Sequence, residues 1–365
     1  MLEDKEILSL ISETEKVYLS ALDKGLQDND IPEQMLQALK KDIFVFSGCK
    51  THSELNQVAR LLLTEDSKVK GFAAFQKDVQ KIYKDYNENY LQAEHVFAVS
   101  SSEMAAKWND LTEGKDRYNL QYRTAGDDRV RDEHAALANV TLDMEDPFWD
   151  EYYPPNGWRC RCTAVQVRKG KYPESNSSDS IAKGVKATSK INKKGENTAA
   201  MFRFNPGKSK QIFPPHHPYR KVSEKVGQTI DGLYSSQRKQ LGRAIDKEVA
   251  IWAKETIPTG GGEINLKNFK TGSAVILRKN VRSISEHFAS PDLKRMAFDI
   301  QKICKASKYI ASAPLDDDKG HKKSRRVTGY NYYSFTYQNE AYRLNVEIID
   351  GKEYPYSINK IITAD

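Results

Sequence analysis

The chain has 365 residues, of which 39% are hydrophobic and 29% are charged, and it carries a formal net charge of +7. This length is enough for roughly two or three domains that each bury a core. No apolar run approaches the roughly eighteen residues of a membrane span, and the charged N-terminus does not resemble a signal peptide. We therefore expect no contact with a membrane.

The charge is unevenly distributed along the chain. Residues 1–167 carry 20 basic and 30 acidic side chains, residues 168–262 carry 19 and 8, and residues 263–365 carry 18 and 12. An acidic first half followed by a basic second half predicts two functional parts. The second part is expected to have an anionic partner, such as a nucleic acid.

Residues 1–110 are predicted to form a helical region, because their apolar residues recur at helical spacing. The sequence pattern favours helices over these segments: 3–25, 32–43, 51–63, 72–99 and 104–108. His52 and His95 lie within them without a second ligand type at a useful spacing, so we expect packing or surface roles for both.

Residues 122–162 contain an unusual density of charged, aromatic and sulfur-bearing side chains. A strand over residues 158–167 would place Cys160 and Cys162 on one face, with Cα atoms roughly 6.5 to 7 Å apart, which is too far for an unstrained disulfide. The other two cysteines, Cys49 and Cys304, are isolated, which also argues against a disulfide framework and indicates a reducing compartment.

Two interpretations of this cysteine pair remain open. Cys160, Cys162 and His134 could supply three ligands to a structural zinc ion, with Asp127 or Asp128 as a fourth. Alternatively, the cysteines are simply buried and reduced, which the frequent burial of free cysteine favours.

Two longer motifs in the same region carry a family resemblance. YRTAGDDRVRDEH over residues 122–134 is followed by DPFWDEYYPPNGWRCRC over 146–162 and by FNPG over 204–207. Over residues 35–220 the chain resembles the phage Mu gpF-like head morphogenesis family, the minor head proteins. The resemblance implies a phage or prophage protein that is made in the bacterial cytoplasm, joins portal and capsid proteins, and enters the virion head in few copies. It implies no reaction.

The predicted head morphogenesis core over residues 111–220 contains a segment of different composition. Residues 168–200 are rich in Lys, Ser, Asn and Gly, so we expect a basic, flexible linker. His216 and His217 lie between prolines, which favours a rigid turn over a metal site. A connecting helix is predicted over residues 221–256, and residues 260–262, which are all glycine, are the expected domain boundary.

Residues 263–365 are predicted to form a small α+β domain with an antiparallel sheet. A strand over 274–277 and helices over 283–288 and 291–305 precede three strands, with hairpin signals at 338–340 and 350–351. The fold class is therefore multidomain, with an α-rich head morphogenesis domain before the α+β domain. Seven tyrosines on the predicted strands could stack unpaired RNA bases, although tyrosine also simply favours strands.

The order of elements in this domain resembles the phage-borne nucleases of the barnase, EndoU, colicin and RelE-like superfamily. The resemblance implies a metal-independent endoribonuclease without a catalytic cofactor, which in an effector would be paired with an immunity protein. Such cleavage needs a general base, a general acid and a cation for the phosphate. We assign His287 as base or acid, Arg325, Arg326 or Arg343 as the cation, and Tyr333 or Ser357 as an orienting or proton-donating group. His321 is interpreted as a surface residue.

The leading hypothesis is a minor head protein that carries a C-terminal ribonuclease acting as a toxin. The alternative is a purely structural head protein whose basic C-terminal domain binds packaged DNA or the portal without catalysis. A third hypothesis, ADP-ribosyl transfer, is weaker because no nucleotide-binding motif is recognisable.

Overall fold

The computed structural model describes residues 4–27, 29–66, 68–112, 114–315 and 326–361. The chain divides into two compact units, Met1–Tyr234 and Ser235–Asp365. Among the described helices, none combines the length and the apolar composition that crossing a bilayer requires.

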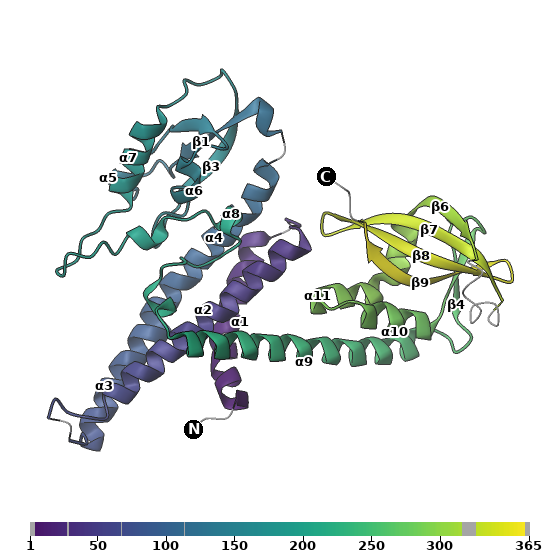
Figure 1. The fold of residues 1–365 in the computed structure, drawn as a ribbon, viewed down its shortest axis with the longest axis horizontal. Helices are drawn as coiled ribbons and strands as arrows, with labels where there is room; N and C mark the ends of the chain where they lie inside the picture. The colour runs from purple at the N-terminus through teal and green to yellow at the C-terminus, as the bar shows by residue number, and fades with distance from the viewer. Residues whose placement is uncertain (1–3, 28, 67, 113, 316–325, 362–365) are drawn as a thin grey trace. The chain divides into compact units, whose positions relative to one another are not determined.

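The first unit begins with helices that pack alongside one another (Figure 1). Their bounds are α1 Asp4–Leu26, α2 Glu33–Arg60, α3 Phe72–Lys84, the π-helical turn η1 Asp85–Tyr90 and α4 Leu91–Leu111. Tyr18, Phe46 and Phe97 are among the buried side chains between α1, α2 and α4, and Phe213 from much later in the chain stacks on Phe46. The helical spacing in residues 1–110 thus corresponds to a real helical core.

A small sheet with short helices follows in the same unit. Its strands are β1 Tyr118–Arg123, β2 Thr141–Asp143 and β3 Thr163–Arg168, in the antiparallel order β2-β1-β3. The accompanying helices are α5 Asp132–Ala135, α6 Phe148–Glu151, α7 Ser177–Ala187 and α8 Pro206–Ser209, with 3₁₀ turns at Lys115–Arg117, Ala200–Phe202 and Pro218–Arg220. The aromatic residues of the 146–153 segment fill the core beneath the sheet.

Two local predictions in this unit differ from the structure. The strand expected over residues 158–167 begins only at Thr163, because Cys160 N–H donates to the carbonyl of Gly157 and closes a turn instead. The segment predicted as a flexible linker contains α7, which is capped by Asn176. This helix packs through Gly184, where a Cβ would lie 2.5 Å from the Tyr152 ring. A helix that buries glycine and serine leaves no hydrophobic pattern in the sequence.

The long helix α9, Glu224–Thr256, belongs to both units. The boundary between the units falls within it, after Tyr234, whereas the sequence had placed the boundary at residues 260–262. Gly262 instead begins strand β4, and Gly261 has a φ of 99° in the turn before it. The glycines therefore belong to the second unit's own fold.

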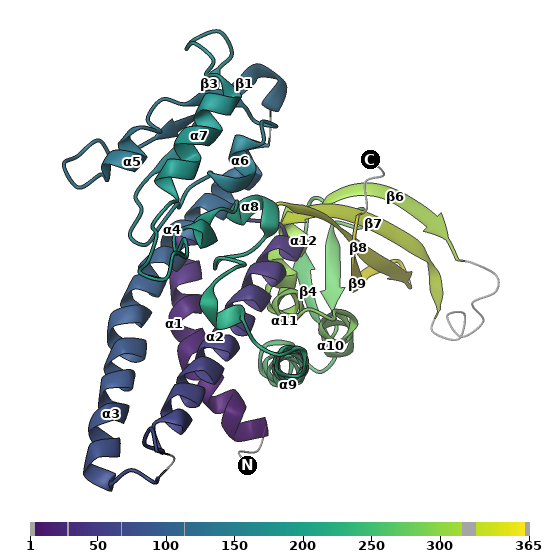
Figure 2. The ribbon, with the colours of Figure 1, turned by 60° about the vertical axis from the view of Figure 1, so that its left-hand side comes forward.

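The second unit is a six-stranded sheet with helices on one face (Figure 2). The strands run in the order β4-β5-β9-β8-β7-β6, and every neighbouring pair is antiparallel except β5 and β9. Their bounds are β4 Gly262–Asn265, β5 Ser273–Ile276, β6 Lys308–Pro314, β7 Val327–Tyr337, β8 Glu340–Ile349 and β9 Lys352–Lys360, with helices α10 Arg278–His287, α11 Pro291–Lys294 and α12 Ile300–Ala306 and the 3₁₀ turn Arg295–Asp299. The prediction of a C-terminal region with an antiparallel sheet is confirmed at this level.

The two faces of this sheet have different environments. Tyr342, Leu344 and Val346 of β8 point into a core shared with Val281 and Ile284 of α10. Because side chains alternate along a strand, the residues between them, such as Arg343 and Asn345, lie on the other face. The residues predicted for RNA cleavage therefore lie on two different faces of this sheet.

Candidate functional site

His134 is positioned by the short helix α5. The backbone N–H groups of His134 and Ala135 donate to the carbonyl of Arg131 at 2.9 and 2.8 Å, which closes the first turn. The imidazole points inward and is only 3% exposed. A buried histidine needs polar partners, and here these are sulfur atoms.

Cys160 and Cys162 lie in the turn that leads into β3. Arg159, immediately before the first cysteine, has a φ of 58°, a left-handed conformation that costs a residue with a Cβ roughly 1 to 2 kcal/mol. At Gly157, a Cβ would lie 2.9 Å from the guanidinium of Arg131. A strained backbone position such as Arg159 is retained where the surrounding structure holds it, and it lies directly before the cysteine pair.

The three side chains converge on a single point. The His134 Nδ1 atom lies 3.6 Å from Cys160 Sγ and 3.7 Å from Cys162 Sγ. The three candidate ligand atoms all lie within 4.8 Å of one another, and all three residues are buried. This grouping is one of the two interpretations that the sequence left open, although the shared direction of the thiols was derived from a strand that begins only at Thr163.

These distances fit a zinc ion. With Zn–S bonds of about 2.3 Å and a Zn–N bond of about 2.0 to 2.1 Å, tetrahedral coordination separates sulfur from nitrogen by about 3.6 Å. The two observed separations match this value. Two thiolates and one imidazole are also a donor set that zinc prefers.

The cysteines differ in their electrostatics. The pKa of Cys160 lies well below its ordinary value, because its sulfur accepts hydrogen bonds from the Cys162 thiol and from His134. The pKa of Cys162 is raised, because its proton is held by the Cys160 sulfur and the side chain is buried. The two cysteines therefore differ in how readily they lose a proton.

A cavity of about 190 Å³ borders the cluster, and four arginines contribute to its wall. These are Arg129, Arg131, Arg159 and Arg161. The Nη1 group of Arg131 also donates to the Trp158 carbonyl at 3.3 Å. The cavity gives the cluster a route to solvent and a positive surrounding.

The fourth ligand suggested by the sequence is not confirmed. Both carboxylate oxygens of Asp127 accept 2.6 Å hydrogen bonds from Arg161, and Arg129 donates a third. This pairing lowers the pKa of Asp127 below its ordinary value. Within the described residues, the cluster contains neither Asp127 nor Asp128.

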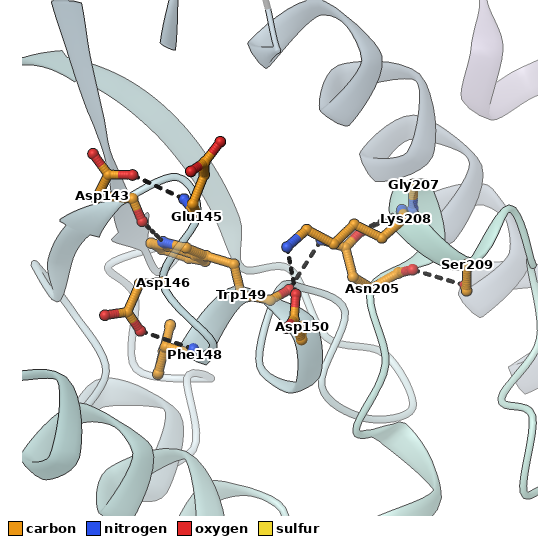
Figure 3. A network of polar contacts seen from close by, with 10 residues as sticks. All are labelled: Asp143, Glu145, Asp146, Phe148, Trp149, Asp150, Asn205, Gly207, Lys208 and Ser209. Carbon is orange, nitrogen blue, oxygen red and sulfur yellow. Dashed lines mark hydrogen bonds and ion pairs between the residues drawn. The ribbon is translucent and has the colours of Figure 1, made fainter. Parts of the chain in front are cut away.

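A second network joins the segments DPFWDEYY and FNPG (Figure 3). The side-chain amide of the buried Asn205 donates to the Trp149 carbonyl at 3.0 Å, while its oxygen accepts from the N–H groups of Gly207 and Lys208. Lys208 in turn forms an ion pair with Asp150. The two motifs, distant in sequence, are thus joined to each other within the first unit.

The residues predicted for RNA cleavage are not brought together. His287 is the exposed last residue of α10, on the helical side of the sheet, whereas Arg343 and Ser357 lie on the uncovered face. Tyr333 is fully buried on the helical side and donates a 2.5 Å hydrogen bond to Glu353. Burial, together with the hydrogen bond to Glu353, raises the pKa of Tyr333.

The two other arginines contribute less to a site. Arg326 is exposed and lies 3.5 Å from Asp350 at the end of the sheet, and Arg325 and His321 fall outside the described residues. Among the predicted residues that the structure describes, Arg343 and Ser357 lie on a common face of the sheet.

That surface contains residues that sequence reasoning missed. The guanidinium of Arg343 lies 4.9 Å from the Tyr332 ring centroid, and its Nε donates to Asn345 at 2.9 Å. Asn345 then donates to Ser357 at 2.9 Å and to Asn359 at 2.5 Å. Strand alternation from Arg343 predicts that Asn345 lies on the same face. That Asn345 also bonds Ser357 and Asn359 could be predicted only from the pairing of β8 with β9.

Residues 14–165 match the model of the family described as Phage Mu protein F like protein. This stretch of the chain is similar to the phage Mu F-like family. The resemblance drawn from the motifs at residues 122–162 is thereby confirmed over residues 14–165. The match ends at residue 165, so it does not address the nuclease resemblance of residues 263–365.

Two curated relatives are similar to this chain. Protein F of Escherichia phage Mu, whose name assigns it to capsid assembly, is 27% identical over 178 residues, or 42% of this chain and 40% of that protein. The Mu-like prophage FluMu F protein of Haemophilus influenzae is 38% identical over 63 residues, or 15% of each chain. The chain thus matches less than half the length of these relatives. No solved structure is significantly similar to it.

Proposed function

We propose that the chain is a phage or prophage head morphogenesis protein that assembles with portal and capsid proteins in the bacterial cytoplasm and enters the virion head. The observation that carries this proposal is the match of residues 14–165 to the phage Mu F-like family, together with the similarity to protein F of phage Mu. Assembly requires a rigid body with surfaces for partner proteins, and the Asn205 network helps to provide such a body.

The end of the α2–α3 helical pair is a candidate surface for a head protein. Leu63 and Val69 form an antiparallel bridge there, and the N–H of Lys70 donates to the Leu62 carbonyl. Val69 is 81% exposed and Phe72 is 77% exposed, and α3 has no fully buried residue. Exposed apolar groups clustered in this way are typical of protein interaction sites.

Co-purification tests the assembly proposal. The tagged full-length chain is co-expressed with the portal and capsid proteins encoded in the same phage genome. We expect the wild-type chain to retain at least one of them and the Val69→Ser/Phe72→Ser variant to retain much less. Ile191→Ser, which changes an exposed apolar residue elsewhere in the unit, is the matched control. The assembly proposal fails if no head protein is retained by the wild-type chain.

A second candidate function concerns the C-terminal unit, for which we propose RNA binding and metal-independent RNA cleavage. The sheet face opposite the helices favours it, because the exposed Arg343 contacts Tyr332 and the buried Asn345 there. Arg343 has the geometry to hold a phosphate and Tyr332 can stack a base. Ser357 is the hydroxyl on this face best connected to the arginine, through Asn345.

The same face revises the role proposed for His287. A group on the helical side of the sheet cannot act on a phosphate held by Arg343 on the opposite side. We therefore expect Arg343→Ala to reduce RNA cleavage strongly and His287→Ala to leave it unchanged.

The experiment incubates the full-length chain with single-stranded RNA in the presence of EDTA. Arg282→Ala removes an exposed arginine of α10 and is the matched charge control. Loss of cleavage in the His287→Ala protein alone would restore the histidine as catalyst. If the wild-type chain leaves RNA intact, the enzymatic proposal is wrong and a structural, nucleic-acid-binding role of this unit is favoured.

A further inference from the structure

We infer that His134, Cys160 and Cys162 bind one zinc ion through Nδ1 and the two Sγ atoms, with a water molecule from the adjacent cavity as the fourth ligand. This site is independent of the proposed assembly and RNA functions. It lies in the first unit, where α5 meets the turn that precedes β3.

The geometry separates this cluster from ordinary buried cysteines. Free buried cysteines usually pack among apolar groups, as Cys304 does in the second unit's core. Cys160 and Cys162 instead both face the same imidazole nitrogen, at nearly equal distances. An imidazole nitrogen can make one good hydrogen bond. Hydrogen bonding alone therefore does not explain why two cysteine sulfurs face the same nitrogen.

The backbone supports the same conclusion. The turn places Cys160 and Cys162 on one side despite the left-handed conformation of Arg159, and no strand pairing holds these residues. Zinc coordination would repay the cost of this turn, because it links the turn to α5 across a sequence separation of 26 residues. The ion would also balance the charge of two thiolates within a wall of arginines.

The fourth position follows from the surroundings. The carboxylate of Asp127 already accepts hydrogen bonds from Arg161 and Arg129, so it is not available as a zinc ligand. The cavity beside the cluster is large enough for water, whose share of liquid volume is about 30 Å³. On binding, each cysteine that is still protonated releases its proton to solvent, and both sulfurs form Zn–S bonds.

Metal analysis of the full-length chain tests the site. The chain is purified without chelators, incubated with zinc chloride, freed of unbound metal and analysed by elemental mass spectrometry. We expect one zinc ion per chain in the wild type and near-complete loss in Cys160→Ser and His134→Ala. Cys49→Ser and Cys304→Ser, which change buried cysteines outside the cluster, should keep the metal. The inference is overturned if the wild type holds less than half an equivalent or if Cys160→Ser retains it.

A second measurement avoids variants that fail to fold. The wild-type chain is treated with a thiol-modifying reagent with and without EDTA, and the modified residues are identified by mass spectrometry. We expect Cys160 and Cys162 to react at least tenfold faster after chelation and to regain protection when zinc is returned. Equal reactivity in both conditions, or rapid modification of Cys160 in the zinc-loaded protein, would instead indicate a reactive cysteine and contradict the site.

Discussion

The side-chain amide of Asn205 donates a 3.0 Å hydrogen bond to the backbone carbonyl of Trp149, which precedes it by 56 residues. The same side chain caps α8 by accepting from the backbone N–H groups of Gly207 and Lys208. One amide thus satisfies three backbone groups and joins two segments of the first unit. Its position joins the short FNPG segment to the longer one.

Replacing Asn205 by alanine should lower the free energy of unfolding by about 2 to 4 kcal/mol, because a helix cap is lost and a buried carbonyl is left unpaired. Urea unfolding followed by tryptophan fluorescence measures this change. Asn89→Ala removes an exposed amide from η1 and should cost no more than about 0.5 kcal/mol. Equal effects of the two substitutions would contradict the linking role of Asn205.

Gly207 should tolerate no side chain. A Cβ at this position would lie 2.2 Å from the Cβ of Trp108, so Gly207→Ala should destabilise the first unit by roughly 1 to 3 kcal/mol or more. Gly232 of α9 has no atom within 4 Å of the corresponding position, so Gly232→Ala should stabilise by about 0.5 to 1 kcal/mol. Thermal or urea unfolding should therefore give shifts of opposite sign.

The buried pair of Lys50 and Glu94 should be sensitive to the loss of one partner. Their charged atoms lie 2.5 Å apart, both side chains are nearly inaccessible, and Tyr18 donates to the same carboxylate. Lys50→Ala should cost about 3 to 5 kcal/mol, since it leaves a buried carboxylate without its cation, whereas Lys50→Met/Glu94→Leu should recover most of that loss. Lys16→Ala, at the exposed pair with Glu13, should cost at most about 1 kcal/mol. A double variant as unstable as the single one would contradict this interpretation.

His217 should make the stability of the first unit depend on pH. Burial, together with the charges of Arg220 and Lys50, lowers the pKa of His217 to about 3. An unfolded histidine titrates near 6.5, so between these values the unfolded chain binds the extra proton and the folded state loses stability as the pH falls. The slope from this group approaches about 1.4 kcal/mol per pH unit.

Urea unfolding between pH 4 and pH 7 tests this dependence. His217→Gln should remove the part of the slope that one proton contributes. His216→Gln, which changes the exposed neighbouring histidine, should leave the slope as it is in the wild type. If the two variants show the same slope, His217 is not the group responsible.

Elements with a strong periodic or turn signal could be predicted from the sequence. The helices of residues 1–110 follow from apolar spacing, and the hairpin between β8 and β9 follows from Asp350 and Gly351, whose φ angles of 49° and 75° suit a tight turn. The helix α7 could not be predicted, because it packs through Gly184 rather than through large apolar side chains. The helix α9 was predicted, but a division of the chain within it leaves no sequence signal, because the helical pattern continues without a break.

The candidate sites show the same contrast. Residue type alone grouped His134 with Cys160 and Cys162, because two thiols and an imidazole form a ligand set in any local conformation. Predicting the candidate RNA-cleavage site required knowing which face of the sheet each residue occupies. His287 and Arg343 have suitable chemistry, but only the packing of α10 against the sheet separates them.

The most direct test of the assembly role is protein analysis of heads purified from the phage or induced prophage that encodes this chain, with and without its gene. The account predicts that the chain is present in DNA-filled heads in few copies, and that deletion of the gene greatly reduces the yield of infectious particles. Infectious heads that form at the normal yield without the chain would contradict it.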